Sequence, residues 1–144
     1  MEQIGAAMNI ILSDQDIGRI ERSLDKMLSS SGAHCALLID RSGQLISSSG
    51  DPSTLDVIAL SALTAANFGA TSEIARLLGE DEFALLFHKG KNENVHFSKI
   101  GTEFIMVTLF DDRTTLGLVR LRTEKVVHEL REIFTEIMER NKGE

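Results

Sequence analysis

The chain has 144 residues, of which 42% are hydrophobic and 26% charged, and a formal net charge of −7. This length suffices for one domain with a proper hydrophobic core. The acidic balance argues against binding to the phosphates of nucleic acids or to anionic lipid, because both attract basic proteins.

The single cysteine, Cys35, rules out an intramolecular disulfide, and its apolar neighbours indicate a buried thiol. The first residues lack the basic flank and long apolar run of a signal peptide. No window approaches the roughly twenty apolar residues of a membrane span. We therefore expect a cytoplasmic protein with a single domain over residues 14–140, preceded by a short segment at 1–13.

The first predicted helix spans residues 14–31. Ser13 is a favourable N-cap, Asp16 is a weaker capping-box partner three residues later, and Gly32 ends the helix. Residues 8–12 can add a short extended segment ahead of it.

Two strands follow, at 33–40 and about 44–48. The sequence Asp40-Arg41-Ser42-Gly43 between them places aspartate first and glycine last, as a type I turn favours, and so predicts a hairpin. A polar stretch then leads into a second helix, which Gly79 ends.

The second predicted helix opens with sixteen uncharged residues, Val57 to Ser72, most of them small. At 100° per residue, one stripe is expected to face the core: Leu60, Leu63, Asn67, Thr71, Ile74 and Leu78. The opposite stripe lacks the charges of a solvated helix and holds Ile58, Ala62, Ala65, Gly69 and Ser72. Small side chains let another backbone approach closely, so this stripe predicts a partner. The alternative is a helix buried on all sides within its own domain.

Residues 83–87 (FALLF) are apolar at every position, which predicts a short strand that is covered on both faces. Charged turns at 80–82 and 88–93 flank this strand, and an edge strand hidden by a second copy of the chain would satisfy the pattern. Two further strands are expected at 94–100 and 104–110. Thr114 or Thr115 then caps the final helix, whose apolar stripe is Leu116, Val119, Val126, Leu130, Ile133 and Ile137, with Thr123 at the remaining position.

The predicted order is α-β-β-α-β-β-β-α, an α+β fold with a five-stranded antiparallel sheet and helices on both faces. This order and four strings of sequence resemble the Roadblock (dynein light chain) family, and most closely its MglB-like bacterial branch. The strings are LLIDRSGQLISSSG (37–50), LSALTAANFGATSEIARLLGEDEF (60–83), FHKG (87–90) and LFDDRTTLGLVRLR (109–122). Together they make the resemblance extend from about residue 16 to residue 138.

The resemblance implies a homodimer in which the central helices lie side by side and the third strands pair across the two-fold axis. Its expected contacts are Ala66, Phe68, Ala70, Phe83, Leu85 and Phe87. The resemblance also implies that the dimer binds a Ras-like small GTPase of the MglA type in its GTP state. The expected binding surface holds Ala62, Ala65, Gly69, Ser72, Glu73 and Arg76.

Regulators of this branch stimulate GTP hydrolysis by reshaping the active site of the GTPase, in cell polarity and gliding motility. They need not donate an arginine. Arg113 is the candidate for an arginine finger, but an arginine beside two aspartates in a loop is more often a solvated turn residue.

The sequence gives little sign of metal binding, nucleotide binding or catalysis. The four histidines, His34, His88, His96 and His128, stand at no spacing that predicts a metal site. No P-loop, dinucleotide fingerprint, GxSxG or HExxH motif is present. We therefore expect no metal, no cofactor and no catalytic site in the chain itself.

Two other functions remain open. One is a Roadblock scaffold or adaptor dimer that has no effect on GTP turnover. The sequence does not separate it from the regulator, because both would use the same helix surface. The other is a small-molecule sensory domain of the profilin or PAS type. This second alternative is less favoured, because a ligand pocket needs polar groups among aromatic residues and the chain has seven Phe but no Trp or Tyr.

Overall fold

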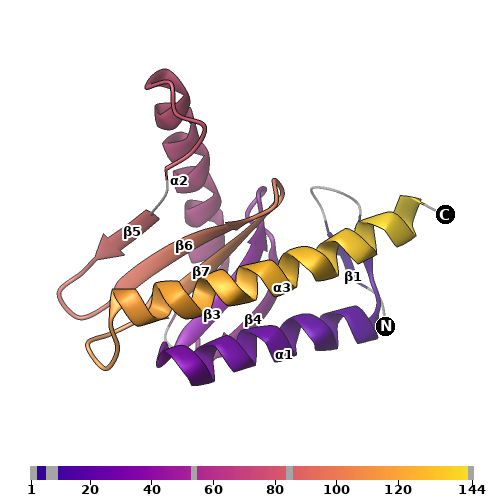
Figure 1. Ribbon diagram of the computed structural model, residues 1–144, viewed down its shortest axis with the longest axis horizontal. Helices are drawn as coiled ribbons and strands as arrows, with labels where there is room; N and C mark the ends of the chain where they lie inside the picture. The colour runs from indigo at the N-terminus through magenta and orange to yellow at the C-terminus, as the bar shows by residue number, and fades with distance from the viewer. Residues whose placement is uncertain (1–2, 6–9, 53–54, 84–85, 143–144) are drawn as a thin grey trace.

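A computed structural model describes residues 3–5, 10–52, 55–83 and 86–142 (Figure 1). In chain order the elements are β1 (Gln3–Gly5), β2 (Ile10–Leu12), α1 (Asp14–Ser31), β3 (Cys35–Asp40), β4 (Leu45–Gly50), α2 (Val57–Leu77), β5 (Leu86–Lys89), β6 (Asn94–Ile100), β7 (Phe104–Phe110) and α3 (Leu116–Lys142). The predicted α+β order is confirmed, and the N-terminal segment adds a small antiparallel hairpin, β1–β2.

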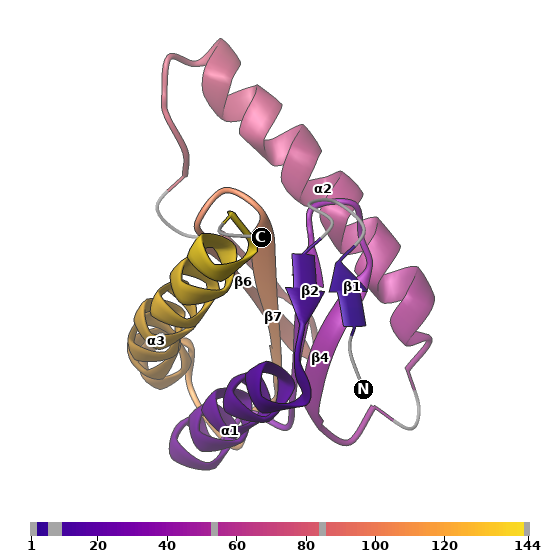
Figure 2. The same cartoon turned by 90° about the vertical axis from the view of Figure 1, so that its right-hand side faces the viewer.

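The main sheet has five antiparallel strands in the order β4-β3-β7-β6-β5. Helices α1 and α3 lie on one face and α2 on the other (Figure 2). The larger core lies under α1 and α3 and includes Leu24, Met106 and Leu130. A smaller core under α2 is centred on Leu37 and Val107.

The caps predicted for α1 and for the start of α3 are confirmed. Ser13 Oγ accepts a hydrogen bond from the Asp16 amide (3.1 Å), and the Asp16 carboxylate accepts one from the Ser13 amide (3.0 Å). At the start of α3, Thr115 is the capping residue, since its Oγ1 accepts from the Leu118 amide at 3.2 Å. The apolar stripe predicted for α3 is buried, apart from the half-buried Leu116.

The pair formed by Asp16 and Arg140 joins the adjacent elements β2 and α1 to α3, which is distant in the sequence. The Asp16 carboxylate is almost fully buried and accepts hydrogen bonds from the guanidinium of Arg140 in the last turns of α3. The same guanidinium donates to the Ile11 carbonyl of β2 at 3.3 Å. The hydrogen bonds from Arg140, together with those from Ser13, lower the pKa of Asp16 to about 2.

Asp16→Asn is therefore expected to lower the free energy of unfolding at pH 7 by about 2 kcal/mol. The carboxylate pKa rises from about 2 in the folded chain to its ordinary value of 3.8 in the unfolded chain. Its stabilisation is thus fully present above the unfolded pKa and is lost as the pH falls through the folded one. Urea denaturation at pH 7 and pH 2.5 measures the free energy of unfolding of both proteins. The difference between wild type and variant should be smaller at pH 2.5. An equal gap at both pH values would contradict the electrostatic origin.

Helix α2 faces the sheet with a stripe different from the predicted one. Leu60 and Phe68 pack against the core under α2, and Ser61 and Thr64 are buried. Three residues predicted to face the core are instead exposed, Leu63 by 68%, Ile74 by 51% and Leu78 by 68%. The prediction is therefore wrong for these three residues. The alternative of a helix buried on all sides also fails for the single chain.

The composition of α2 explains the error. Because the helix is apolar on every side, its periodicity carries little information about which side is buried. Small residues on both sides let the helix approach the β3–β4 hairpin closely. A side chain added at Gly43 of this hairpin would meet the Cα of Ala62 at 3.0 Å.

Helix α2 also bears on the membrane prediction. Among the described residues it is the one helix that is long and apolar enough to cross a membrane, judged by length and composition alone. The expectation that no window would reach this limit is wrong. The alanines, the aliphatic residues and the absence of charge over residues 57–72 raise the mean hydropathy. The buried Ser61 and Thr64 belong to the side of the helix that packs against the sheet.

The third strand of the main sheet begins later than predicted. Phe83 lies before it and is half-buried, while Leu85 falls outside the described residues. His88 and Lys89, expected in a turn, extend β5 and pair with Val95 and Asn94. The turn that follows is closed by a hydrogen bond from the Gly90 amide to the Glu93 carbonyl (2.9 Å).

Candidate functional site

Helix α2 crosses the sheet and extends past its β5 edge. It starts above the β3–β4 hairpin, where the Ala62 backbone lies against Gly43. Further along, Phe68 and Ser72 line a groove together with Leu86 of β5 and Phe97 of β6. Because β5 is the edge strand, the turns after Ser72 project beyond the sheet, as Figure 1 shows.

The outer surface of α2 has two flanks whose members are three or four residues apart. The first, here called the small flank, consists of Ile58, Ala62, Ala65, Gly69, Ser72 and Arg76. The second, here called the leucine flank, consists of Leu63, Ala66, Ala70, Ile74 and Leu77. Most of these residues are exposed, and Ala65 is half-buried. Ile58 and Leu77 are 84% and 72% exposed, so each flank displays apolar surface to solvent.

The predicted GTPase-binding residues come together on this surface. Five of them form most of the small flank, and Glu73 lies beside it in an ion pair with Arg76. In the part of the chain that the structure describes, a side chain added at Gly69 would meet no atom within 4 Å beyond its own stretch of helix. The flank is therefore open and can accept a closely packed partner.

The residues predicted to contact a second copy fall into two groups. Ala66 and Ala70 are exposed on the leucine flank. Phe68 packs into the core under α2, and the Phe87 ring stacks on Phe110 with centroids 5.9 Å apart, beside the core formed by Ala33 and Val119. Phe68 and Phe87 are thus half-buried by their own chain.

Strand β5 has one hydrogen-bonded neighbour, β6, among the residues that the structure describes. Its other edge can therefore pair with another strand. Leu86 packs against the core under α2, whereas Phe87 packs against the core formed by Ala33 and Val119. The chain itself covers part of both faces of β5, which explains why both faces of the strand are apolar.

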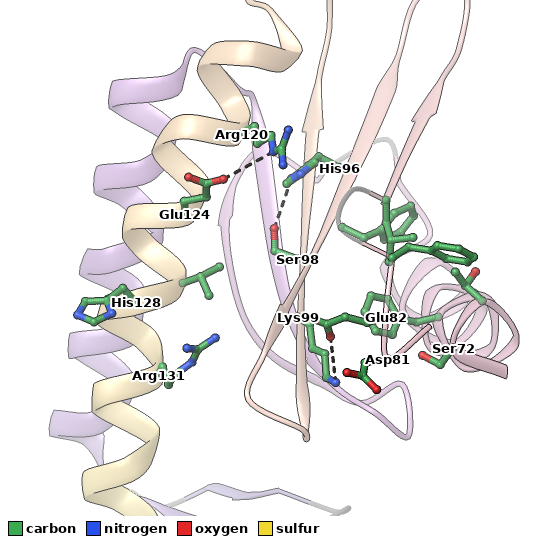
Figure 3. A pocket seen from close by; sticks show the side chains of 16 residues that line it. Ser72, Asp81, Glu82, His96, Ser98, Lys99, Arg120, Glu124, His128 and Arg131 are labelled. Atoms are coloured by element: carbon green, nitrogen blue, oxygen red, sulfur yellow. Dashed lines mark hydrogen bonds and ion pairs between the residues drawn. The ribbon is translucent and has the colours of Figure 1, made fainter. Parts of the chain in front are cut away.

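An open groove of about 470 Å³ lies between α3 and segment 81–83, along β5 and β6 (Figure 3). Its charged side chains are largely paired: Lys99 lies 3.4 Å from Glu82, and Arg120 lies 3.6 Å from Glu124. Burial and the nearby Arg120 lower the pKa of His96 on its floor. Because its positive and negative side chains balance, the groove does not favour a small ligand of either charge.

Arg113 is engaged by its own chain. Its Nε and Nη2 atoms donate to the Asp111 carboxylate at 2.9 and 2.8 Å, which lowers the pKa of Asp111 to about 2. The side chain remains exposed to solvent, as predicted for a turn residue. Close by, His34 lies beside Glu93 and Asp111, a juxtaposition that their sequence spacing does not reveal.

Comparison with known proteins gives one family and a consistent group of structures. Residues 19–110 match the Roadblock/LC7 domain family. The structure of Myxococcus xanthus MglB is similar, with a TM-score of 0.83, 36% sequence identity, and coverage of 88% of this chain and 95% of that one. The gliding protein MglB from Thermus thermophilus has a TM-score of 0.82 and 30% identity, with 88% and 96% of the two chains covered. No curated protein sequence matches significantly.

More distant structures share the fold alone. A profilin II from Acanthamoeba castellanii is 18% identical with a TM-score of 0.53, and covers 78% of this chain and 96% of its own. The match to the Roadblock/LC7 domain covers more than half of this chain, and the MglB structures align over most of it. The chain therefore belongs to the Roadblock/LC7 family and is MglB-like within it.

Proposed function

We propose that the chain is a homodimeric regulator that binds a Ras-like small GTPase of the MglA type in its GTP state and stimulates GTP hydrolysis. It would act in the cytoplasm, in cell polarity and gliding motility, without a catalytic site of its own. The observation that carries this proposal is the outer surface of α2, which displays two apolar flanks to solvent. One partner would cover each flank.

The leucine flank and the β5 edge support self-association. The end of α2 projects past β5 and carries the exposed Ile74 and Leu77. If two β5 strands pair across a two-fold axis, each projecting helix end reaches the second copy. A symmetric interface of this kind buries the same apolar residues on both copies. An MglB structure that is 30% identical to this chain has a tetrameric arrangement, so that relative self-associates.

The small flank supports binding of the GTPase. Gly69 and Ser72 are small and exposed, so a partner can pack closely against the helix backbone there. Glu73 and Arg76 supply polar contacts at one end of this surface, where they are already paired. An apolar centre beside a polar end is the usual organisation of a protein interface.

The regulator would act by changing the conformation of the GTPase, so that catalytic groups of the GTPase itself come into place. Arg113→Ala should then leave the stimulation of GTP hydrolysis within a few-fold of wild type, because Arg113 is held by Asp111. Single-turnover hydrolysis with the regulator in excess measures this. A loss of about a thousandfold with binding preserved would show that Arg113 supplies catalytic charge in trans.

One experiment separates the regulator from the scaffold alternative. The chain is mixed with a purified MglA-type GTPase loaded with GTP or GDP, and both complex formation and phosphate release are measured. Preferential binding of the GTP form with faster phosphate release supports the proposal. Binding without any change in phosphate release supports the scaffold, and absence of binding to either form contradicts both.

A further inference from the structure

Three side chains with metal-binding chemistry meet at one end of the sheet. His34 immediately precedes β3, Glu93 immediately precedes β6, and Asp111 immediately follows β7. Strand β7 lies between β3 and β6, so the strand register brings these three positions together. One potential ligand atom from each side chain lies within 4.8 Å of the other two.

The backbone at these positions is held by hydrogen bonds. The His34 amide donates to the Leu109 carbonyl at 3.1 Å, and the Glu93 carbonyl accepts from the Gly90 amide at 2.9 Å. The Asp111 carbonyl accepts from the Thr114 amide at 3.3 Å. The three ligands are thus presented by fixed strand ends, and only their side chains need to move to meet an ion.

We propose that His34, Glu93 and Asp111 form a binding site for a divalent transition-metal ion such as Zn²⁺. One imidazole nitrogen and two carboxylates are ligands that zinc accepts, and water would complete the coordination. The two carboxylates supply a charge of −2, which matches a divalent cation. Ligand atoms around one zinc ion lie about 3–4 Å apart, so small side-chain rotations would bring this triad into range.

Two existing interactions compete with the ion. His34 Nε2 lies 2.7 Å from Glu93 Oε2, and the Arg113 guanidinium binds the Asp111 carboxylate through Nε and Nη2. Metal binding replaces the first contact with two metal–ligand bonds and displaces Arg113 from Asp111. Removing Arg113 should therefore strengthen metal binding, whereas removing any one ligand should weaken it.

The test is calorimetric titration of the metal-free, untagged chain with Zn²⁺ at pH 7.5. We expect His34→Ala and Glu93→Gln each to weaken binding at least about tenfold, by analogy with the loss of supporting residues at known metal sites. Arg113→Ala should tighten binding several-fold. The matched control is His128→Ala, because His128 is exposed on α3 and lies 3.3 Å from Glu132 in an ordinary surface pair. That variant should bind zinc as wild type does.

Thermal unfolding followed by circular dichroism accompanies each titration. Glu93 is exposed, so Glu93→Gln decides the question if His34→Ala does not fold. Unchanged zinc affinity in a folded His34→Ala or Glu93→Gln variant would overturn the proposal. If His128→Ala lost as much zinc affinity as His34→Ala, that result would also overturn the proposal, because the zinc would then be bound by scattered surface histidines.

Discussion

Gly69→Arg is expected to abolish binding of the GTP-loaded GTPase while leaving the chain folded. Beyond its own stretch of helix, a side chain added at Gly69 meets no atom of the described residues within 4 Å, so the single chain has room for an arginine. In a complex that packs on the small flank, the arginine would add volume at a tight contact and a charge that loses its water. The expected cost is about 3 kcal/mol or more, which is at least a hundredfold in the dissociation constant.

Fluorescence anisotropy with a labelled GTP analogue on the GTPase measures this loss, and thermal unfolding reports on the fold. Ala65→Arg should have the same effect on binding, although Ala65 is half-buried and its variant needs the folding check more. Leu121→Arg, on an exposed position of α3, is the matched control and should bind normally. If Gly69→Arg instead separated the two copies, the small flank would be the dimer contact.

Replacing both Ile74 and Leu77 by aspartate is expected to convert the dimer into folded monomers. Both side chains are more than half exposed in the single chain, so their loss costs the monomer little. In the proposed dimer they are buried against the second copy, where an unpaired carboxylate is unfavourable. The two changes together should weaken dimerisation at least about a hundredfold. Sedimentation equilibrium across micromolar concentrations measures the mass directly.

Two other variants make this result specific. Leu121→Asp removes a similarly exposed leucine from α3 and should leave the dimer intact. Phe87→Asp should destabilise the fold, because the Phe87 ring stacks on the buried Phe110. A mass equal to one chain for the wild-type protein at tens of micromolar would contradict the proposed dimer altogether.

The elements with strong local signals were predictable from the sequence. The capping box at Ser13 and Asp16 marks the start of α1, and Gly32, with a φ of +78°, marks its end. The Asp40 side chain accepts hydrogen bonds from the Ser42 and Gln44 amides, which fixes the predicted turn between β3 and β4. Each of these signals depends on residues a few positions apart, so the sequence displays it directly.

The orientation of α2 was not predictable in the same way. Its sheet-facing side holds Ser61 and Thr64, while Leu63 and Leu77 point into solvent. A hydrophobicity pattern assumes that the largest apolar residues face the chain's own core. That assumption fails for these leucines, which the proposed partner would cover. The stripe of small residues was visible in the sequence because it depends on residue size alone.

The cluster at His34 was invisible for a different reason. His34, Glu93 and Asp111 are far apart in the chain and meet only through the order of three strands. A five-stranded antiparallel sheet predicted from sequence leaves that order open. Knowing the strand order would have aligned the ends of β3, β6 and β7, and so would have pointed to the cluster.

The pairing of α1 with α3 has a consequence for synthesis on the ribosome. The Asp16–Arg140 contact joins residues 124 positions apart, and the apolar side of α1 is buried in the core that α3 completes. Ile20, Leu24 and Met27 therefore emerge early in translation but have no complete cover until α3 has left the ribosome. Long-range contacts of this kind form late in folding, and exposed apolar surface attracts other chains. The nascent chain should thus depend on chaperones until the last turns of α3 are available.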